Sequence, residues 1–172
     1  MARITRAAII QASNALPDTT DVHAIKQAMI DKHVPLIAQA AEQGAQICCL
    51  QEIFSGPYFC AEQDIRWYET AEPVPDGPTV TFMQQLAKEH GMIMVVPIYE
   101  QAMTGVYYNT AAVIDADGTY LVAVVKWTGM RERIEVGISI GDEWRVGPLE
   151  NLPEGEAVAG RWETRREIKL NN

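Results

Sequence analysis

The sequence predicts one α/β layered domain, and the order of its apolar segments is the basis for this prediction. Three short apolar runs, at 3–11, 45–50 and 92–100, have the composition of buried strands. The segments between them, at 22–44 and 78–91, have helical spacing or helix-start and helix-stop residues. Strands that alternate with helices in this way are typical of layered α/β domains.

The first helix is expected to begin after Asp18–Asp21, whose side chains suit a helix start, and to continue to Gly44. Pro35 lies inside this segment. Proline has no backbone N–H and its ring clashes with the preceding turn, so Pro35 is expected to kink or divide the helix.

The second helix is expected to begin at Pro78 and to end at Gly91, in agreement with the preference for proline at the first turn and glycine at the C-cap. Residues 51–77 are rich in proline and glycine and are predicted to form a loop. The stretches 106–115 and 119–125 flank the turn sequence DADG, which predicts a β-hairpin.

Composition and charge exclude several classes of function. A chain of 172 residues with a net charge of −9 lacks the clustered Lys and Arg that nucleic acid or an anionic membrane would require. No stretch is long and apolar enough to cross a membrane. The three cysteines form neither a disulfide framework nor a Cys-x-x-Cys metal site, so a reducing, cytoplasmic location is expected.

Glu52 is the first candidate for chemistry. It directly follows the apolar run 45–50, and ligand sites in open α/β sheets lie beyond the carboxyl ends of the strands. Beside Leu50, Ile53 and Phe54 it is expected to be partly desolvated, which would raise its pKa toward the range of a general base. The alternative is a loop glutamate that caps a backbone N–H or lies in solvent.

The stretch 44–60, GAQICCLQEIFSGPYFC, resembles the first active-site motif of the nitrilase superfamily of carbon–nitrogen hydrolases. More narrowly, it resembles the branch of the bacterial β-ureidopropionases and N-carbamoylputrescine amidases. The supporting stretches are AAIIQAS at 7–13, PDGPTVTFMQQLAKEHGMIMVVPIYE at 75–100 and YYNTAAVIDADGTYL at 107–121. The resemblance therefore extends over residues 4–121.

This resemblance implies a fold, a mechanism and a substrate class. The family folds as an α-β-β-α sandwich, and this chain resembles the first half of it. Members commonly form dimers, so a homo-oligomer is possible. They hydrolyse small amides, here N-carbamoyl amino acids or N-carbamoyl amines, without a metal or other cofactor. A cysteine attacks the carbonyl carbon, a glutamate acts as general base, and a lysine stabilises the oxyanion.

By this resemblance Glu52 is the general base and Lys126 the oxyanion-stabilising lysine. Lys126 has the matching position after the DADG turn, although the residues between Leu121 and Lys126 do not match the family. The alternative for Lys126 is a lysine at the end of a strand in solvent. Tyr58 and Phe59 line the substrate pocket by resemblance, with aromatic packing as the alternative.

The nucleophile has no counterpart in this chain. In the family it belongs to a strand after the lysine, whereas no cysteine follows Cys60 here. Cys48 and Cys49 lie in a predicted buried strand, where a thiol is unreactive, and Cys60 matches a family position that is not the nucleophile. Whether the chain is an enzyme is therefore left open.

The chain divides into residues 1–126, which resemble the N-terminal part of the hydrolase domain, and a divergent tail, 127–172. The tail could form a strand or two, or be poorly ordered. A frameshift or gene rearrangement near Leu121 is one hypothesis for the divergence. The leading functional hypothesis is a truncated carbon–nitrogen hydrolase that is weak or inactive. The alternatives are a non-catalytic α/β module that pairs with a homologue or another partner, and a poorly folded fragment.

The three histidines have no spacing that suits a metal. His23, His33 and His90 fall in predicted helices and are expected at the surface or at helix ends.

Overall fold

A computed structural model describes residues 5–59, 62, 64–128, 134–140 and 143–148, with side chains described up to Ala123. The predicted order of helices and strands is confirmed up to β5. In chain order the elements are β1 (Ala7–Ile10), α1 (Val22–Glu42), β2 (Ile47–Leu50), the 3₁₀ helix η2 (Ile65–Thr70), α2 (Pro78–His90), β3 (Ile93–Met103), β4 (Val106–Ile114), β5 (Tyr120–Thr128), β6 (Ile134–Ile140) and β7 (Glu143–Pro148).

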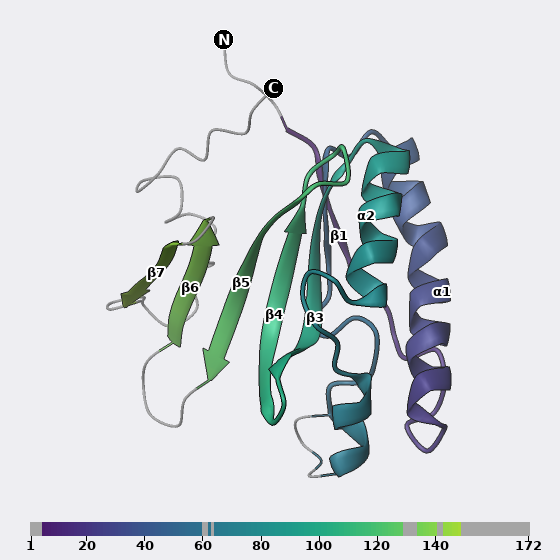
Figure 1. The fold of residues 1–172 in the computed structure, drawn as a ribbon. Helices are drawn as coiled ribbons and strands as arrows, with labels where there is room; N and C mark the ends of the chain where they lie inside the picture. The colour runs from purple at the N-terminus through teal and green to yellow at the C-terminus, as the bar shows by residue number, and fades with distance from the viewer. Residues whose placement is uncertain (1–4, 60–61, 63, 129–133, 141–142, 149–172) are drawn as a thin grey trace.

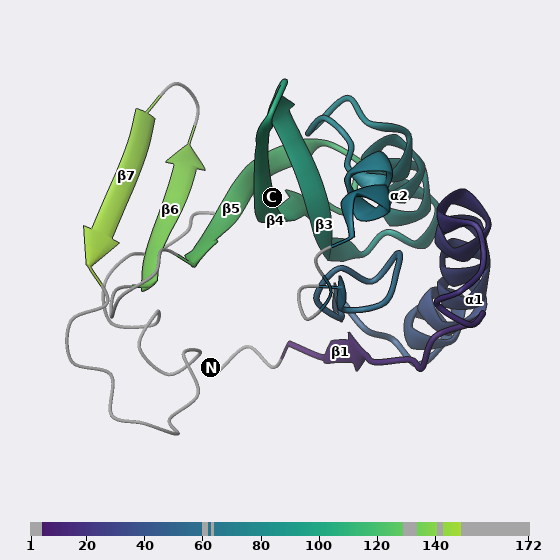
Figure 2. The ribbon, with the colours of Figure 1, turned by 90° about the horizontal axis from the view of Figure 1, so that it is seen from below.

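The described strands form one sheet whose spatial order is the same as their order in the sequence, from β1 to β7. β1, β2 and β3 are parallel, and every later neighbour is antiparallel. The two helices are the crossover connections between the parallel strands, and they cover one face of the sheet (Figure 1). Figure 2 shows the same arrangement from below. The predicted α/β class is therefore confirmed.

Helix α1 begins at the N-cap Asp21, whose carboxylate accepts hydrogen bonds from the backbone N–H groups of His23 and Ala24. The helix then continues without interruption to Glu42, so Pro35 does not divide it. Buried apolar residues on both sides of the proline, Ile30 and Ile37, hold the two halves of the helix against the core. This packing outweighs the missing backbone hydrogen bond.

Helix α2 has the predicted ends, with Pro78 in its first turn and Gly91 as its C-cap in the left-handed region at φ 59°. The DADG turn also forms as predicted. The backbone N–H of Asp115 donates to the carbonyl of Thr119, and Gly118 adopts a φ of 89° that favours glycine. A second hairpin, between β3 and β4, turns at Gly105 (φ 79°) and was not predicted.

The core lies between the helices and one face of the sheet. Alternate residues of β3, Met94, Val96 and Ile98, are buried against both helices, as the period of two in a strand requires. The intervening residues point to the other face, where they are only half buried. Across that open face one register row is entirely apolar: Ile9, Cys49, Val95, Val113 and Val122.

Two strands of the tail, β6 and β7, extend the sheet beyond β5. Among the described residues, no helix combines the length and the apolar character that a membrane span requires.

Candidate active site

Glu52 lies two residues beyond the end of β2, at the edge of the sheet where the parallel strands terminate. This edge is tied together by Gln51, whose side-chain oxygen accepts a hydrogen bond from the backbone N–H of Ala12, just beyond β1. The next residue, Ile53, has a φ of 48°, in the left-handed region that a β-branched side chain rarely adopts. Strained backbone of this kind clusters at functional sites.

The backbone reversal at Ile53 also explains why one expectation about Glu52 is wrong. Ile53, Phe54 and Ser55 turn inward and are buried. The Glu52 side chain stays outside this turn and is exposed. The expected desolvation of Glu52 by its apolar neighbours is therefore absent, since those neighbours pack on the core side of the chain.

Asn109, in the middle of β4, binds Glu52. Its side-chain Nδ2 donates a hydrogen bond of 2.5 Å to Oε1 of Glu52. In the sheet register, Asn109 is opposite Tyr99 on β3 and opposite Lys126 on β5. Residues that are directly opposite in adjacent strands point to the same face of a sheet. Tyr99, Asn109 and Lys126 thus form one row across three strands, and Glu52 is attached at its centre.

The structure describes Lys126 through its backbone, and its side chain lies outside the described part. Its place in β5 is one strand away from Asn109, in the same row. The two predicted site residues are therefore linked through Asn109 in the sheet, with Glu52 on the β2 side and Lys126 on the β5 side.

The cysteines of β2 are packing residues. Cys48 is fully buried under the helices, and burial raises the pKa of its thiol to about 11, with a smaller contribution from Cys49. Cys49 lies on the open face and is half buried, and burial raises its pKa as well. Thiols with raised pKa values are poor nucleophiles at neutral pH, because the thiolate is the reactive form. Cys60 lies outside the described residues.

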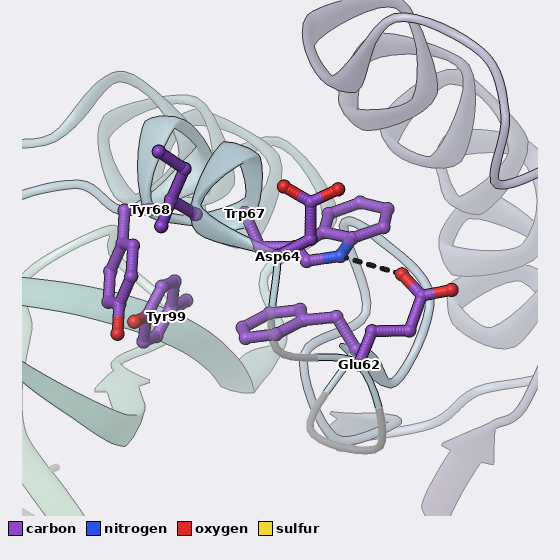
Figure 3. Close-up of a pocket in the computed structure, with 7 residues that line it drawn as sticks. Glu62, Asp64, Trp67, Tyr68 and Tyr99 are labelled. Carbon is purple, nitrogen blue, oxygen red and sulfur yellow. Dashed lines mark hydrogen bonds between the residues drawn. The ribbon is translucent and has the colours of Figure 1, made fainter.

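A cavity of about 310 Å³ has Tyr99, a member of this row, in its lining. The residues around it come from the loop after Glu52, from η2 and from β3, and Figure 3 shows their arrangement. In this view the carboxylate of Glu62 lies at one end, beside Trp67, and Tyr68 and Tyr99 lie at the other. The lining residues are Phe59, Glu62, Asp64, Ile65, Trp67, Tyr68 and Tyr99. Tyr58, also expected in the pocket, is 61% exposed and does not line this cavity.

A buried ion pair holds the end of the loop that connects β2 to α2. Glu72 is 5% exposed and forms a salt bridge with Lys26 of α1. The Glu72 carboxylate also accepts hydrogen bonds from Thr79 at the start of α2, from the backbone N–H at 2.8 Å and from the hydroxyl at 2.6 Å. The Glu72 backbone pairs with β3, donating its N–H to the carbonyl of Tyr99. Glu72 therefore joins both helices to β3 beside the cavity.

His33 contradicts the expectation that the histidines lie at the surface or at helix ends. It is fully buried within α1, where its ring contacts Phe54 edge-on at 5.0 Å between centroids. Its Nδ1 lies 2.7 Å from the carbonyl oxygen of Met29, and its buried Nε2 has no hydrogen-bond partner among the residues that the structure describes. His23, by contrast, is exposed and lies 3.6 Å from Glu69. No three acidic, histidine or cysteine side chains gather in a metal-binding cluster in the described part of the chain.

Asn109 and the cavity residues of η2 were not singled out from the sequence. For Asn109 a signal existed, because asparagine is unfavourable inside a strand, and it interrupts an otherwise apolar and aromatic run. For the carboxylates Glu62 and Asp64 there was none, since they lie in a loop where acidic residues are common.

The family model described as carbon-nitrogen hydrolase matches residues 6–135. Among curated proteins, the chain is 38% identical to a beta-ureidopropionase of Arabidopsis thaliana over 121 residues, which cover 69% of this chain and 29% of that protein. It is 44% identical over 86 residues to an N-carbamoylputrescine amidase of Solanum lycopersicum, covering 50% of this chain and 28% of that protein. The chain thus spans less than a third of these relatives.

A similar fold is present in the carbon-nitrogen hydrolase from Helicobacter pylori G27, with a TM-score of 0.62 and 20% sequence identity. The likeness covers 72% of this chain and 40% of that one. At this level of identity the comparison concerns the fold.

Proposed function

The chain belongs to the carbon–nitrogen hydrolase family, and we propose that it carries the general base and the oxyanion-stabilising lysine of an amidase-type hydrolase, Glu52 and Lys126. The hydrogen bond from Asn109 to Glu52 carries this proposal. Asn109 is the register partner of Lys126, so one strand connects the two residues that the chemistry requires. The strained backbone at Ile53, directly after Glu52, is a second support, since strain of this kind clusters at functional sites.

In the proposed reaction Glu52 takes the proton of a thiol as the thiol attacks the carbonyl carbon of an amide or carbamoyl group. The negative charge on the former carbonyl oxygen is stabilised by the ammonium of Lys126. Glu52 returns this proton to the nitrogen of the leaving amine, and its carboxylate then takes a proton from the water that hydrolyses the acyl-enzyme. Asn109 would hold the Glu52 carboxylate in position, because its amide donates a hydrogen bond to one of the two carboxylate oxygens.

The thiol is the part that this chain does not supply. Cys48 and Cys49 have raised pKa values and lie in β2, and no cysteine follows Cys60 in the sequence. We therefore propose that the chain by itself is weak or inactive as a hydrolase. The substrate class that fits the family is N-carbamoyl amino acids or N-carbamoyl amines.

The test is ammonia release from N-carbamoyl-β-alanine and from N-carbamoylputrescine by the purified chain. We expect no enzyme-like rate. An enzyme-like rate that disappears in Glu52→Gln would support the role of Glu52 and overturn the proposed inactivity. A rate that is the same in Glu52→Gln would overturn the role of Glu52. Glu89→Gln, an exposed change on α2, is the matched control.

A second candidate function is a non-catalytic module that pairs with a homologue or a second copy. It is favoured by the apolar row across the open face of the sheet, in which Ile9 is 83% exposed. Apolar surface of this kind commonly marks an interaction site. Light scattering at increasing protein concentration tests it, and we expect the mass to rise. Ile9→Lys should abolish that rise, whereas a constant monomeric mass would exclude self-pairing.

A further inference from the structure

The aromatic cavity adjoins the row that contains the candidate general base. Tyr99, which lines the cavity, is the register partner of Asn109, and Asn109 binds Glu52. Direct neighbours in an antiparallel pair are about 5 Å apart between Cα atoms. A small linear substrate whose reacting carbonyl lies at Glu52 would therefore extend its distal end past Tyr99 into the cavity.

Most of the cavity wall is aromatic. Phe59 stacks on Trp67 with 5.6 Å between ring centroids, and it also contacts Tyr99 at 5.0 Å. Tyr68 lies 6.3 Å from Tyr99 and is 47% exposed, which places it near solvent. Aromatic faces carry negative electrostatic potential, so a wall of this kind attracts cations more than carboxylates.

The charged groups that line the cavity also favour a cation over an anion. Glu62 and Asp64 line the cavity, and among its described lining residues none is basic. Arg66, which lies outside the lining, pairs with Glu62 at 3.4 Å and with Asp64 at 3.2 Å. One guanidinium thus faces two carboxylates, and the wall keeps an excess of one negative charge.

The chain itself places a cation against this wall. The guanidinium carbon of Arg66 lies 4.4 Å from the centroid of the Trp67 ring, within the range of a cation–π contact. Trp67 also donates its indole N–H to Glu62 at 3.0 Å, which fixes the carboxylate beside the ring. Because Trp67 is thus in contact with Arg66 and Phe59, a ligand cation would meet the other lining rings, Tyr68 and Tyr99, and the carboxylates of Glu62 and Asp64.

We propose that this cavity is the subsite for the distal end of the substrate and that it selects a positively charged end, with Glu62 and Asp64 as the specificity-determining residues. The substrate class is then N-carbamoyl amines with a distal ammonium rather than N-carbamoyl amino acids with a distal carboxylate. The inference rests on the proposed function for the position of the reacting group, although binding at the subsite does not depend on catalysis.

The test measures binding without turnover, with three probes of equal length: butylammonium, butyrate and butanol. Ligand-observed NMR titrations of the full chain give the three affinities. We expect butylammonium to bind roughly 10-fold more tightly than butyrate, since a cation–π contact and a net charge of one both favour it. Equal affinity for the three probes, or tighter binding of butyrate, would overturn the proposal.

Substitutions assign the effect to the two carboxylates. Glu62→Gln keeps the length of the side chain and an oxygen that can accept from Trp67, and it should remove most of the preference. In Glu62→Gln/Asp64→Asn the charge of Arg66 is no longer balanced, so we expect the preference to reverse toward butyrate. Glu89→Gln, on the exposed face of α2, should leave all three affinities unchanged. An unchanged preference in the double variant would refute the role of these residues.

Failure of the subsite and failure of the proposed function give different results. A preference for butylammonium without any hydrolysis supports the subsite and leaves the chain inactive. Hydrolysis of N-carbamoyl-β-alanine and N-carbamoylputrescine at equal rates, with no preference among the three probes, refutes the subsite. It also overturns the proposed inactivity but keeps the assignment as a hydrolase.

Discussion

Nδ2 of Asn109 and Oε1 of Glu52 are joined by a 2.5 Å hydrogen bond that connects the end of β2 to the middle of β4. The two residues are 57 positions apart in the sequence, so the contact depends on the correct pairing of β2, β3 and β4. It is a sensitive point at which to test the candidate site.

Asn109→Asp places a second carboxylate against Glu52. Like charges at this distance raise the pKa of one of the carboxyl groups in the folded state. The loss of stability in the variant should therefore be largest above the raised pKa of the folded state. It should shrink as the pH falls through that pKa and disappear near the unfolded pKa of about 4.3. Because Glu52 is exposed, the loss at neutral pH should be at most about 1 kcal/mol.

Urea unfolding at several pH values measures this effect. Asn109→Ala is the control, since it removes the hydrogen bond without adding a charge and should show no such pH dependence. Glu52→Gln/Asn109→Asp should recover stability at neutral pH. An identical pH profile for Asn109→Asp and Asn109→Ala would show that the two side chains do not meet.

The thiols of β2 should be unreactive in the folded chain. In Cys60→Ser, which leaves only Cys48 and Cys49, alkylation by iodoacetamide at neutral pH reports on these two. For Cys48, a rise in pKa from 9.0 to about 11 lowers the thiolate fraction roughly 100-fold. We expect slow labelling in buffer and fast labelling in urea. Fast labelling of Cys48 in buffer would contradict its role as a packing residue.

Breaking the ion pair between Lys26 and Glu72 should be costly. The Lys26→Met change leaves the buried Glu72 carboxylate without its cation, and losses of about 3–5 kcal/mol are typical of such changes. Lys88→Met, an exposed change on α2, should cost less than about 1 kcal/mol. Chemical denaturation compares the two.

A double-mutant cycle with Glu72→Gln separates the ion pair from the other contacts of Glu72. The double variant should lose less stability than the sum of the single changes, because neither charge is then left alone. Strict additivity would show that the ion pair adds nothing to stability beyond the hydrogen bonds between Glu72 and Thr79.

His33 should make the fold sensitive to acid. Desolvation by burial lowers its pKa, an effect that the nearby charge of Lys32 adds to and the Met29 carbonyl partly opposes. The folded chain therefore keeps a neutral ring at a pH where the unfolded chain takes up a proton. The stability that the neutral His33 ring contributes is fully present above about pH 6.5, the pKa of histidine in the unfolded chain. It is lost progressively as the pH falls from there toward and below the pKa of His33 in the folded chain.

Thermal unfolding between neutral and mildly acidic pH tests this prediction. His33→Gln should flatten the slope below about pH 6.5, whatever its effect on stability at neutral pH. His23→Gln, at an exposed position on the same helix, should keep the slope of the unsubstituted chain. An unchanged slope in His33→Gln would assign the acid sensitivity to other groups.

Helix ends and turns that carry a local sequence signal could be predicted from the sequence. The capping residues Asp21 and Gly91 and the DADG turn fix helix ends and a hairpin within a few residues, so these were predictable. The expected division of the helix at Pro35 and the expected surface position of His33 were wrong for a common reason. A proline inside a helix and a histidine in its core are both unfavourable locally, and only the packing of α1 against the sheet stabilises them.

The candidate site could be predicted only in part, because local sequence patterns identify strands and helices but not the long-range contacts between them. Glu52 follows a recognisable strand, whereas its hydrogen bond to Asn109 depends on long-range register that no local pattern encodes. Glu52 is exposed and is followed by a residue with a positive φ, Ile53, and an isoleucine gives no indication of such an angle.

The order of the strands in the sheet has a consequence for how the chain is made. Each described strand pairs with the strand that precedes it in the sequence, so none has to be inserted between two that are already in place. During synthesis on the ribosome, β1, α1 and β2 can dock first, and every later strand can join at the growing edge as it emerges. Assembly and translation thus proceed in the same direction, and at each stage the edge opposite β1 is the one that the next strand will cover.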